Sequence, residues 1–152
     1  LFKWSLRAPF YCFENYDEKL HHHLEEMVTI LGQLFQRSDD LLDFNIRNEE
    51  NKAILGDLKS GYLNSFAAFL MKNASESKRS EFMKCQTMAE VYSLVGEKEF
   101  FSAVEEFDNV NTSLIELFDH HLHRLESFLG ESQLSLIKDL RTVSQKLYWR
   151  RT

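Results

Sequence analysis

Residues 17–44, with the sequence DEKLHHHLEEMVTILGQLFQRSDDLLDF, decide the fold of this chain. Apolar side chains recur at steps of three and four residues, the spacing of one face of an α-helix. The positions on this face are Leu20, Leu24, Met27, Leu31, Leu34, Ser38 and Leu42. Asp17 is the expected N-cap, because a short side-chain oxygen there accepts from the first free N–H groups. The pattern predicts a long helix, roughly 42 Å at about 1.5 Å per residue, with one buried face.

The helical period continues through the rest of the chain. We expect further helices over residues 1–13, 61–72, 78–95, 100–129 and 132–150, with Pro9 bending or starting the first of them. The predicted core faces of the last two are Phe100, Val104, Phe107, Leu114, Phe118, His121, Leu125 and Phe128, and then Leu136, Leu140, Val143 and Leu147. We therefore expect one all-α domain over residues 1–152, built as an antiparallel helical bundle.

The composition excludes several classes of protein. Among 152 residues there are 13 Phe, one Pro and five Gly, which suits a helical core and disfavours a turn-rich β-sandwich. The net charge of −6 argues against nucleic-acid binding. The sequence contains no run of 18 apolar residues, so we expect no membrane-spanning segment. Two cysteines are too few for a disulfide scaffold, so we expect a cytoplasmic protein.

Asp39, Asp40 and Asp43 form an acidic cluster at the end of the long helix. At about 100° per residue they share an arc with Gln36, and the like charges of Asp39 and Asp43 repel by roughly 0.2–0.5 kcal/mol. A hard divalent cation such as Mg²⁺ would relieve that repulsion. Taken alone, the same pattern also describes a solvated acidic helix end.

The surrounding motifs resemble the trans-isoprenyl diphosphate synthase (polyprenyl synthetase) family. Residues 35–43, FQRSDDLLD, are similar to that family's second aspartate-rich motif, FQxxDDxLD. Lys52 and the stretch 56–61, GDLKSG, resemble the following GKxxGxDLxxGKxTLP. The resemblance covers nearly all of this chain but only the C-terminal half of a family member. The chain also begins at Leu1 without Met, so we expect it to be half of a larger isoprenoid synthase domain that turns over only with its other half.

The resemblance implies a Mg²⁺-dependent prenyltransferase that condenses an allylic diphosphate with isopentenyl diphosphate. It assigns Asp39, Asp40 and Asp43 to a metal ion, and Lys3 and Lys52 to the allylic diphosphate. By the same mapping Gln36 lines the site near the reacting chain, Asp57 lies near the metal or the diphosphate-binding loop, and Arg150 and Arg151 approach the isopentenyl diphosphate. The resemblance also implies a homodimer, or assembly with the missing N-terminal half.

Several positions depart from the family pattern. Lys3 is similar to the lysine of the family's KT motif on the preceding helix, but Trp4 replaces its threonine. In GKxTLP the lysine is Tyr62 and the proline is Phe66, and the glycine expected before Asp57 is displaced. These changes leave two alternatives to chain elongation open. One is a terpene-cyclase-like enzyme that ionises the diphosphate and rearranges the cation, and the other is a non-catalytic partner subunit.

Six histidines lie outside these motifs. His21, His22 and His23 cannot all point one way on a helix, so we expect them at the surface. His121 lies on the apolar stripe, and we expect it to form a hydrogen bond in the core. Asp119 and His123, four residues apart, offer a less favoured zinc site.

Overall fold

The computed structural model describes residues 2–11, 17–44, 54–130, 134 and 137–149, and within these ranges it contains helices and no strand. The all-α fold class is therefore confirmed. The chain folds as two compact units, one from Leu1–Gln36 with Asn111–Arg150 and one from Arg37–Val110. The prediction of a single domain over residues 1–152 stays a prediction.

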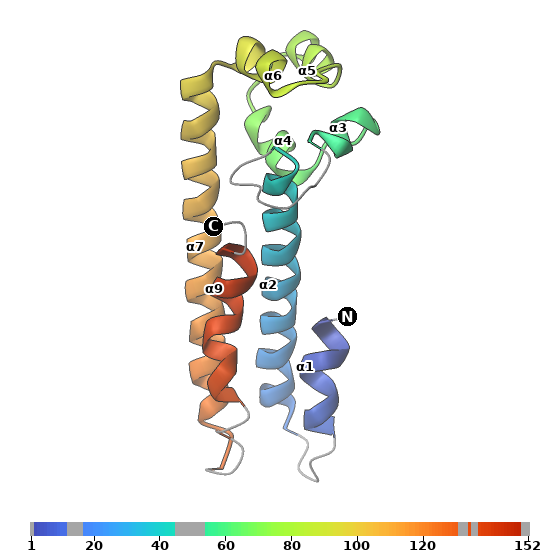
Figure 1. The fold of residues 1–152 in the computed structure, drawn as a ribbon. Coiled ribbons are helices and arrows are strands. Elements are labelled where there is room, and N and C mark those ends of the chain that lie inside the picture. Colours follow the sequence, from blue (N-terminus) through green and yellow to red (C-terminus); the bar gives the residue numbers. More distant parts are fainter. Residues whose placement is uncertain (1, 12–16, 45–53, 131–133, 135–136, 150–152) are drawn as a thin grey trace. The chain divides into compact units, whose positions relative to one another are not determined.

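The first unit contains α1 (Phe2–Tyr11), most of α2 (Glu18–Leu42), the C-terminal half of α7 (Glu97–Glu126), the 3₁₀-helix η1 (Lys138–Thr142) and α9 (Val143–Tyr148). Here α2 and α7 run in opposite directions, with α1 beside α2 and α9 beside α7 (Figure 1). Helix α1 continues through Pro9, so the hydrogen bond that proline cannot donate is lost only near the C-terminal end of this helix.

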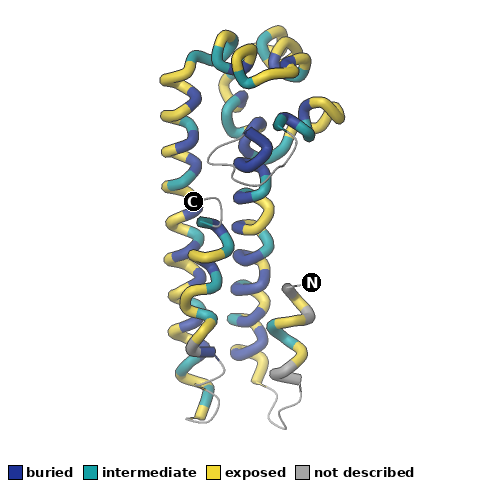
Figure 2. The backbone as a smooth tube through the Cα atoms, in the orientation of Figure 1, coloured by how far each residue is buried: buried dark blue, intermediate teal, exposed yellow. Residues whose placement is uncertain are grey.

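Helix α2 forms as its sequence predicts. The Asp17 carboxylate accepts hydrogen bonds from the backbone N–H groups of Lys19 (2.8 Å) and Leu20 (3.3 Å), which confirms it as the N-cap. All seven predicted core positions of this helix are buried, and Figure 2 shows buried residues recurring along α2. No described helix combines the length and the hydrophobicity needed to cross a bilayer.

The second unit contains the short helices α3 (Gly56–Lys59), α4 (Ser65–Leu70), α5 (Glu76–Phe82) and α6 (Met88–Val95), with the end of α2 and the start of α7. Phenylalanine rings form its core, and Phe66 is their centre. Its ring centroid lies 5.1 Å from that of Phe44, 5.6 Å from that of Phe100 and 5.3 Å from that of Phe107. These fully buried rings meet edge to face and hold α4 against both long helices.

The predicted helix over residues 78–95 is two helices, so that prediction is wrong. Helix α5 ends at Phe82, and α6 begins after Thr87. Thr87 and Glu90 form a capping box, in which each side chain accepts a hydrogen bond from the other residue's backbone N–H. This local pairing favours a new helix start over continuation. Gly96, at φ 96°, ends α6 as expected.

The predicted core face of the last helix is also wrong by one residue. Leu140, Val143 and Leu147 are half-buried, whereas Ile137, Ser144 and Tyr148 are buried; Leu136 lies outside the described residues. The Tyr148 hydroxyl accepts a 2.6 Å hydrogen bond from the Asn111 amide of α7, and both side chains are fully buried. Because a buried polar pair is costly to break, it fixes the rotation of α9.

On α7 itself, Ile115 and Leu122 join the predicted core, while Phe128 lies beyond the helix end and is exposed.

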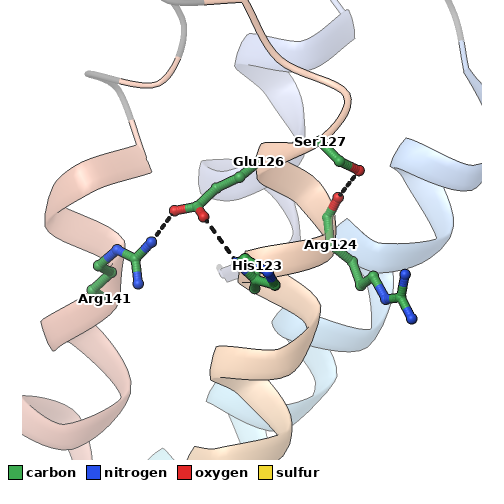
Figure 3. Close-up of polar contacts among 5 residues, drawn as sticks. All are labelled: His123, Arg124, Glu126, Ser127 and Arg141. Carbon is green, nitrogen blue, oxygen red and sulfur yellow. Dashed lines mark hydrogen bonds and ion pairs between the residues drawn. The ribbon is translucent and has the colours of Figure 1, made fainter.

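The end of α7 is joined to η1 by an ion pair. The Glu126 carboxylate pairs with the Arg141 guanidinium and lies 3.3 Å from the His123 imidazole (Figure 3). His123 is exposed and pairs with Glu126. Within the part of the chain that the structure describes, no three His, Cys, Asp or Glu side chains are placed to bind one metal ion, so the zinc alternative at Asp119 and His123 has no support.

Two histidines form a direct contact between α2 and α7. The Nδ1 atoms of His23 and His121 lie 3.0 Å apart, so one ring donates to the other. The hydrogen bond expected for His121 is present, but both rings are half-buried and do not lie in the core. His21 is buried, contrary to the surface position expected for all three residues 21–23. Burial lowers the pKa of both His23 and His121, and the neighbouring imidazoles lower each pKa further. For His23 the Arg124 guanidinium acts in the same direction, whereas for His121 the Glu26 carboxylate opposes it.

This contact predicts a stability that depends on pH. Because the folded pKa values of His23 and His121 lie below the ordinary 6.5, the unfolded chain takes up these protons first as the pH falls. The stabilisation is therefore complete above pH 6.5 and is lost as the pH falls from there through the lower folded values. We expect the melting temperature to decrease between about pH 7.5 and 5.5, and His121→Asn to reduce that decrease. His123→Gln, at an exposed position on the same helix, is the matched control. Its melting temperature should decrease with falling pH as much as that of the parent chain.

Candidate functional site

The C-terminal end of α2 carries the acidic cluster, and its last member, Asp43, accepts hydrogen bonds from three successive backbone N–H groups. The carbonyl oxygen of Asp43 accepts from Leu55 N at 2.7 Å. Its carboxylate Oδ1 accepts from Gly56 N at 2.7 Å, and both carboxylate oxygens lie 3.3–3.4 Å from Asp57 N. Asp43 is 4% exposed. A buried carboxylate is tolerated because these N–H groups replace the water that it loses.

Leu55 makes this convergence possible. It has φ 56° and ψ 36°, a left-handed conformation that turns the chain into α3, and its side chain is fully buried. In the family pattern GxDL a glycine is expected at this position, and a left-handed residue explains why glycine suits it. Consecutive left-handed and helical residues aim their N–H groups inward and create a concave anion-binding arrangement. Here the anion is the Asp43 carboxylate.

Asp40 and Asn64 fasten α4 to the same end of α2. Asp40 is 2% exposed, and its Oδ2 accepts from the backbone N–H of Ser65, the first residue of α4, at 2.9 Å. Asn64 is the N-cap of α4, with Oδ1 accepting from Ala67 N at 2.9 Å. Its amide nitrogen donates to the Asp57 carboxylate at 3.0 Å and to the Asp40 carbonyl at 3.3 Å. The structure therefore brings Asp40, Asp43 and Asp57 into one hydrogen-bonded network.

The remaining predicted site residues are spread along the chain. Asp39 is half-buried near the end of α2, and Gln36 is exposed on the same helix. In the first unit, the Lys3 ammonium pairs with the Glu25 carboxylate at 2.9 Å, which lowers the pKa of Glu25 together with the nearby Arg7. Tyr62, which replaces the family's lysine, is 69% exposed between α3 and α4. The predicted residues that lie outside the described ranges are Lys52, Arg150 and Arg151.

The fit of the acidic cluster to a magnesium ion differs among its members. Mg²⁺ needs carboxylate oxygens in an octahedral shell. Asp39, half-buried, is of the right chemistry and accessibility, whereas both Asp43 oxygens already accept N–H groups and Asp40 uses one oxygen on Ser65. In the described residues, the three carboxylates do not converge as a ligand group. Asp39 therefore fits a role as a metal ligand, whereas Asp43 does not.

Asn64 is a site residue that the sequence interpretation misses. A signal for it exists, because Asn before Ser65-Phe66-Ala67-Ala68-Phe69-Leu70 is a typical N-cap preceding an apolar run. The apolar pattern instead predicts one helix from Gly61 to Lys72, which places Asn64 in its interior. The actual α4 begins after Asn64, and the cap is what brings the amide to Asp57.

Comparisons with known proteins agree with the motifs. The family model described as polyprenyl synthetase matches residues 1–123, a range that contains α1 to α6, most of α7 and the whole acidic network. No curated protein matches the chain. No solved structure matches it either.

The network predicts that Asn64→Ala is destabilising. Loss of an N-cap costs about 1–2 kcal/mol, and Asp57 loses its amide donor as well. We expect a fall in the free energy of unfolding of about 2 kcal/mol, measured by urea denaturation. Ser75→Ala is the matched control, because Ser75 caps α5 through Lys78 N, at the start of a different helix from the one that the acidic network holds. It should cost only about 1 kcal/mol. Equal losses for the two variants would contradict the additional role of Asn64.

Proposed function

Because this chain belongs to the polyprenyl synthetase family, whose activity is prenyl transfer, we propose that it contributes to a Mg²⁺-dependent transfer between an allylic diphosphate and isopentenyl diphosphate. The observation that carries the proposal is the acidic end of α2, where Asp39 is half-buried beside carboxylates already fastened by α3 and α4. The motif FQRSDDLLD lies within the matched range.

In the proposed reaction the carbon–oxygen bond of the allylic diphosphate breaks, and the isopentenyl double bond attacks the resulting cation. The new cation then loses a proton to the released diphosphate, which re-forms a double bond. Bound Mg²⁺ supplies charge stabilisation to the departing diphosphate. Asp39 would hold the metal, and Lys52 would contribute positive charge toward the same diphosphate. Gln36 lies one turn before Asp39 on α2 and lines the path of the reacting chain. Arg150 and Arg151 contact isopentenyl diphosphate.

The proposal includes a partner for this chain. We propose that residues 1–152 act with a further segment that carries a first aspartate-rich motif, either in the same polypeptide or in an associated one. A homodimer and a cytoplasmic location complete the proposal. Incubation of the full-length protein with Mg²⁺, labelled isopentenyl diphosphate and allylic diphosphates of several lengths tests it. Elongated products support transfer, cyclic products without isopentenyl incorporation support the cyclase alternative, and the absence of any product supports a non-catalytic subunit.

Replacement of the proposed metal ligand should affect the chemical step. We expect Asp39→Asn in the full-length protein to lower kcat far more than it changes KM, because the charge that Asp39 balances is largest in the ionising transition state. Initial rates at saturating Mg²⁺ measure both constants. Glu26→Gln, which removes a carboxylate from the same helix, is the control and should leave kcat close to that of the parent. An unchanged kcat in Asp39→Asn would show that Asp39 holds no essential metal.

Tyr62 provides a second test. A lysine in its place offers a full charge to the diphosphate, and charge-assisted hydrogen bonds are about twice as strong as neutral ones. Since the Tyr62 side chain is exposed, the substitution disturbs no core packing, and we expect Tyr62→Lys to raise the transfer rate or leave it level. Lys52→Ala should lower the rate by about 10²-fold, the scale of losing one preorganised donor. If Tyr62→Lys abolished activity while Lys52→Ala had no effect, the loop that follows the acidic cluster would not bind diphosphate as the resemblance implies. That result would favour the cyclase alternative.

A further inference from the structure

The two outer carboxylates of the acidic motif have different surroundings. Asp43 lies four residues after Asp39 at the end of α2, yet its carboxylate is buried against the N-terminus of α3, while Asp39 is half-buried. Two like charges at this spacing repel. The N–H groups of Gly56 and Asp57 offset the charge of Asp43 and thereby reduce that repulsion without a metal ion.

The contacts of Asp43 hold the backbone of residues 55–57. Its carbonyl holds Leu55, its carboxylate holds Gly56 and Asp57, and Leu55 is the only described residue other than glycine with a positive φ. A left-handed leucine is unfavourable by itself and persists because neighbouring bonds hold it. A Cβ atom added at Gly56 would come within 3.3 Å of Asp43 Oδ1, which shows how closely the carboxylate and this backbone fit.

From α3 the same arrangement continues to Asp57 and Asn64. Asp57 N is held by Asp43, and the Asp57 carboxylate is held by the Asn64 amide, which also contacts the Asp40 carbonyl on α2. Asp57 O accepts from Ser60 N at 3.1 Å and from Tyr62 N at 2.8 Å, which connects the network to the position where the family places its diphosphate-binding lysine. These hydrogen bonds therefore connect Asp43 to Asp57 and to residue 62.

We propose that Asp43 is a positioning residue, which anchors the left-handed turn at Leu55 and the N-terminus of α3 and so places Asp57 and the 60–64 segment, and that it is not a metal ligand. The inference rests on the proposed function only in assigning Mg²⁺ to Asp39. It divides the aspartate-rich motif into a first carboxylate that faces the metal and a last carboxylate that holds the backbone.

The test compares Asp39→Asn, Asp43→Asn and Asp43→Ala in the full-length protein. Thermal unfolding in EDTA measures stability without metal, and calorimetric titration with Mg²⁺ in the presence of inorganic diphosphate measures metal affinity. An asparagine at position 43 keeps one oxygen to accept from Gly56 N, whereas alanine keeps none. We expect the metal-free melting temperature to fall by about 3–8 °C in Asp43→Ala and to fall less in Asp43→Asn, which keeps one acceptor oxygen.

Metal affinity should follow a different order. We expect Asp39→Asn to lose about tenfold or more, Asp43→Asn to lose less, and Asp43→Ala to lose more than Asp43→Asn because the turn collapses. Equal losses of affinity in all three variants, with unchanged metal-free melting temperatures, would overturn the inference. If Asp43→Ala does not fold, Asp43→Asn is compared with Asp39→Asn instead. A smaller loss of Mg²⁺ affinity in Asp43→Asn supports the inference, and an equal or larger loss contradicts it. Unchanged affinity in Asp39→Asn would instead refute the metal assignment in the proposed function, while the metal-free stabilities would still test Asp43.

Discussion

Hydrogen bonds from the N-termini of α3 and α4 to buried carboxylates at the end of α2 are the constraint on which the candidate site depends. Without them Asp40 and Asp43 would be negative charges removed from water, a large free-energy cost. With them the same charges fix where two short helices begin. Neither α3 nor α4 is long enough to be stable alone, so the carboxylates and the phenylalanine core around Phe66 together determine their positions.

This arrangement changes the meaning of an aspartate-rich motif. Carboxylates that cluster on one helix face invite the interpretation that all of them bind metal. In this chain the burial and partners of Asp40 and Asp43 support a structural role for at least part of the motif, while Asp39 retains the accessibility that a ligand needs. The chemistry we propose thus depends on backbone amides as much as on the acidic side chains.

The first unit depends on polar contacts of another kind. The Asn111–Tyr148 hydrogen bond is buried between α7 and α9, and the half-buried His23–His121 contact joins α2 to α7. The buried pair allows one rotation of α9 against α7, since other rotations leave a buried donor or acceptor without a partner. Apolar packing alone tolerates more than one rotation.

The sequence by itself determined the helices with strong periods and the family. The apolar stripe of α2, its Asp17 cap and the motif FQRSDDLLD follow from local spacing, because they depend on residues close together in the chain. Tertiary structure decided the rotation of α9, the left-handed Leu55 and the partners of Asp40, Asp43 and Asn64. These features depend on hydrogen bonds between residues well separated in sequence, which a periodicity cannot encode. The break at Thr87 is local instead, because it depends on a capping box that competes with an unbroken helical pattern.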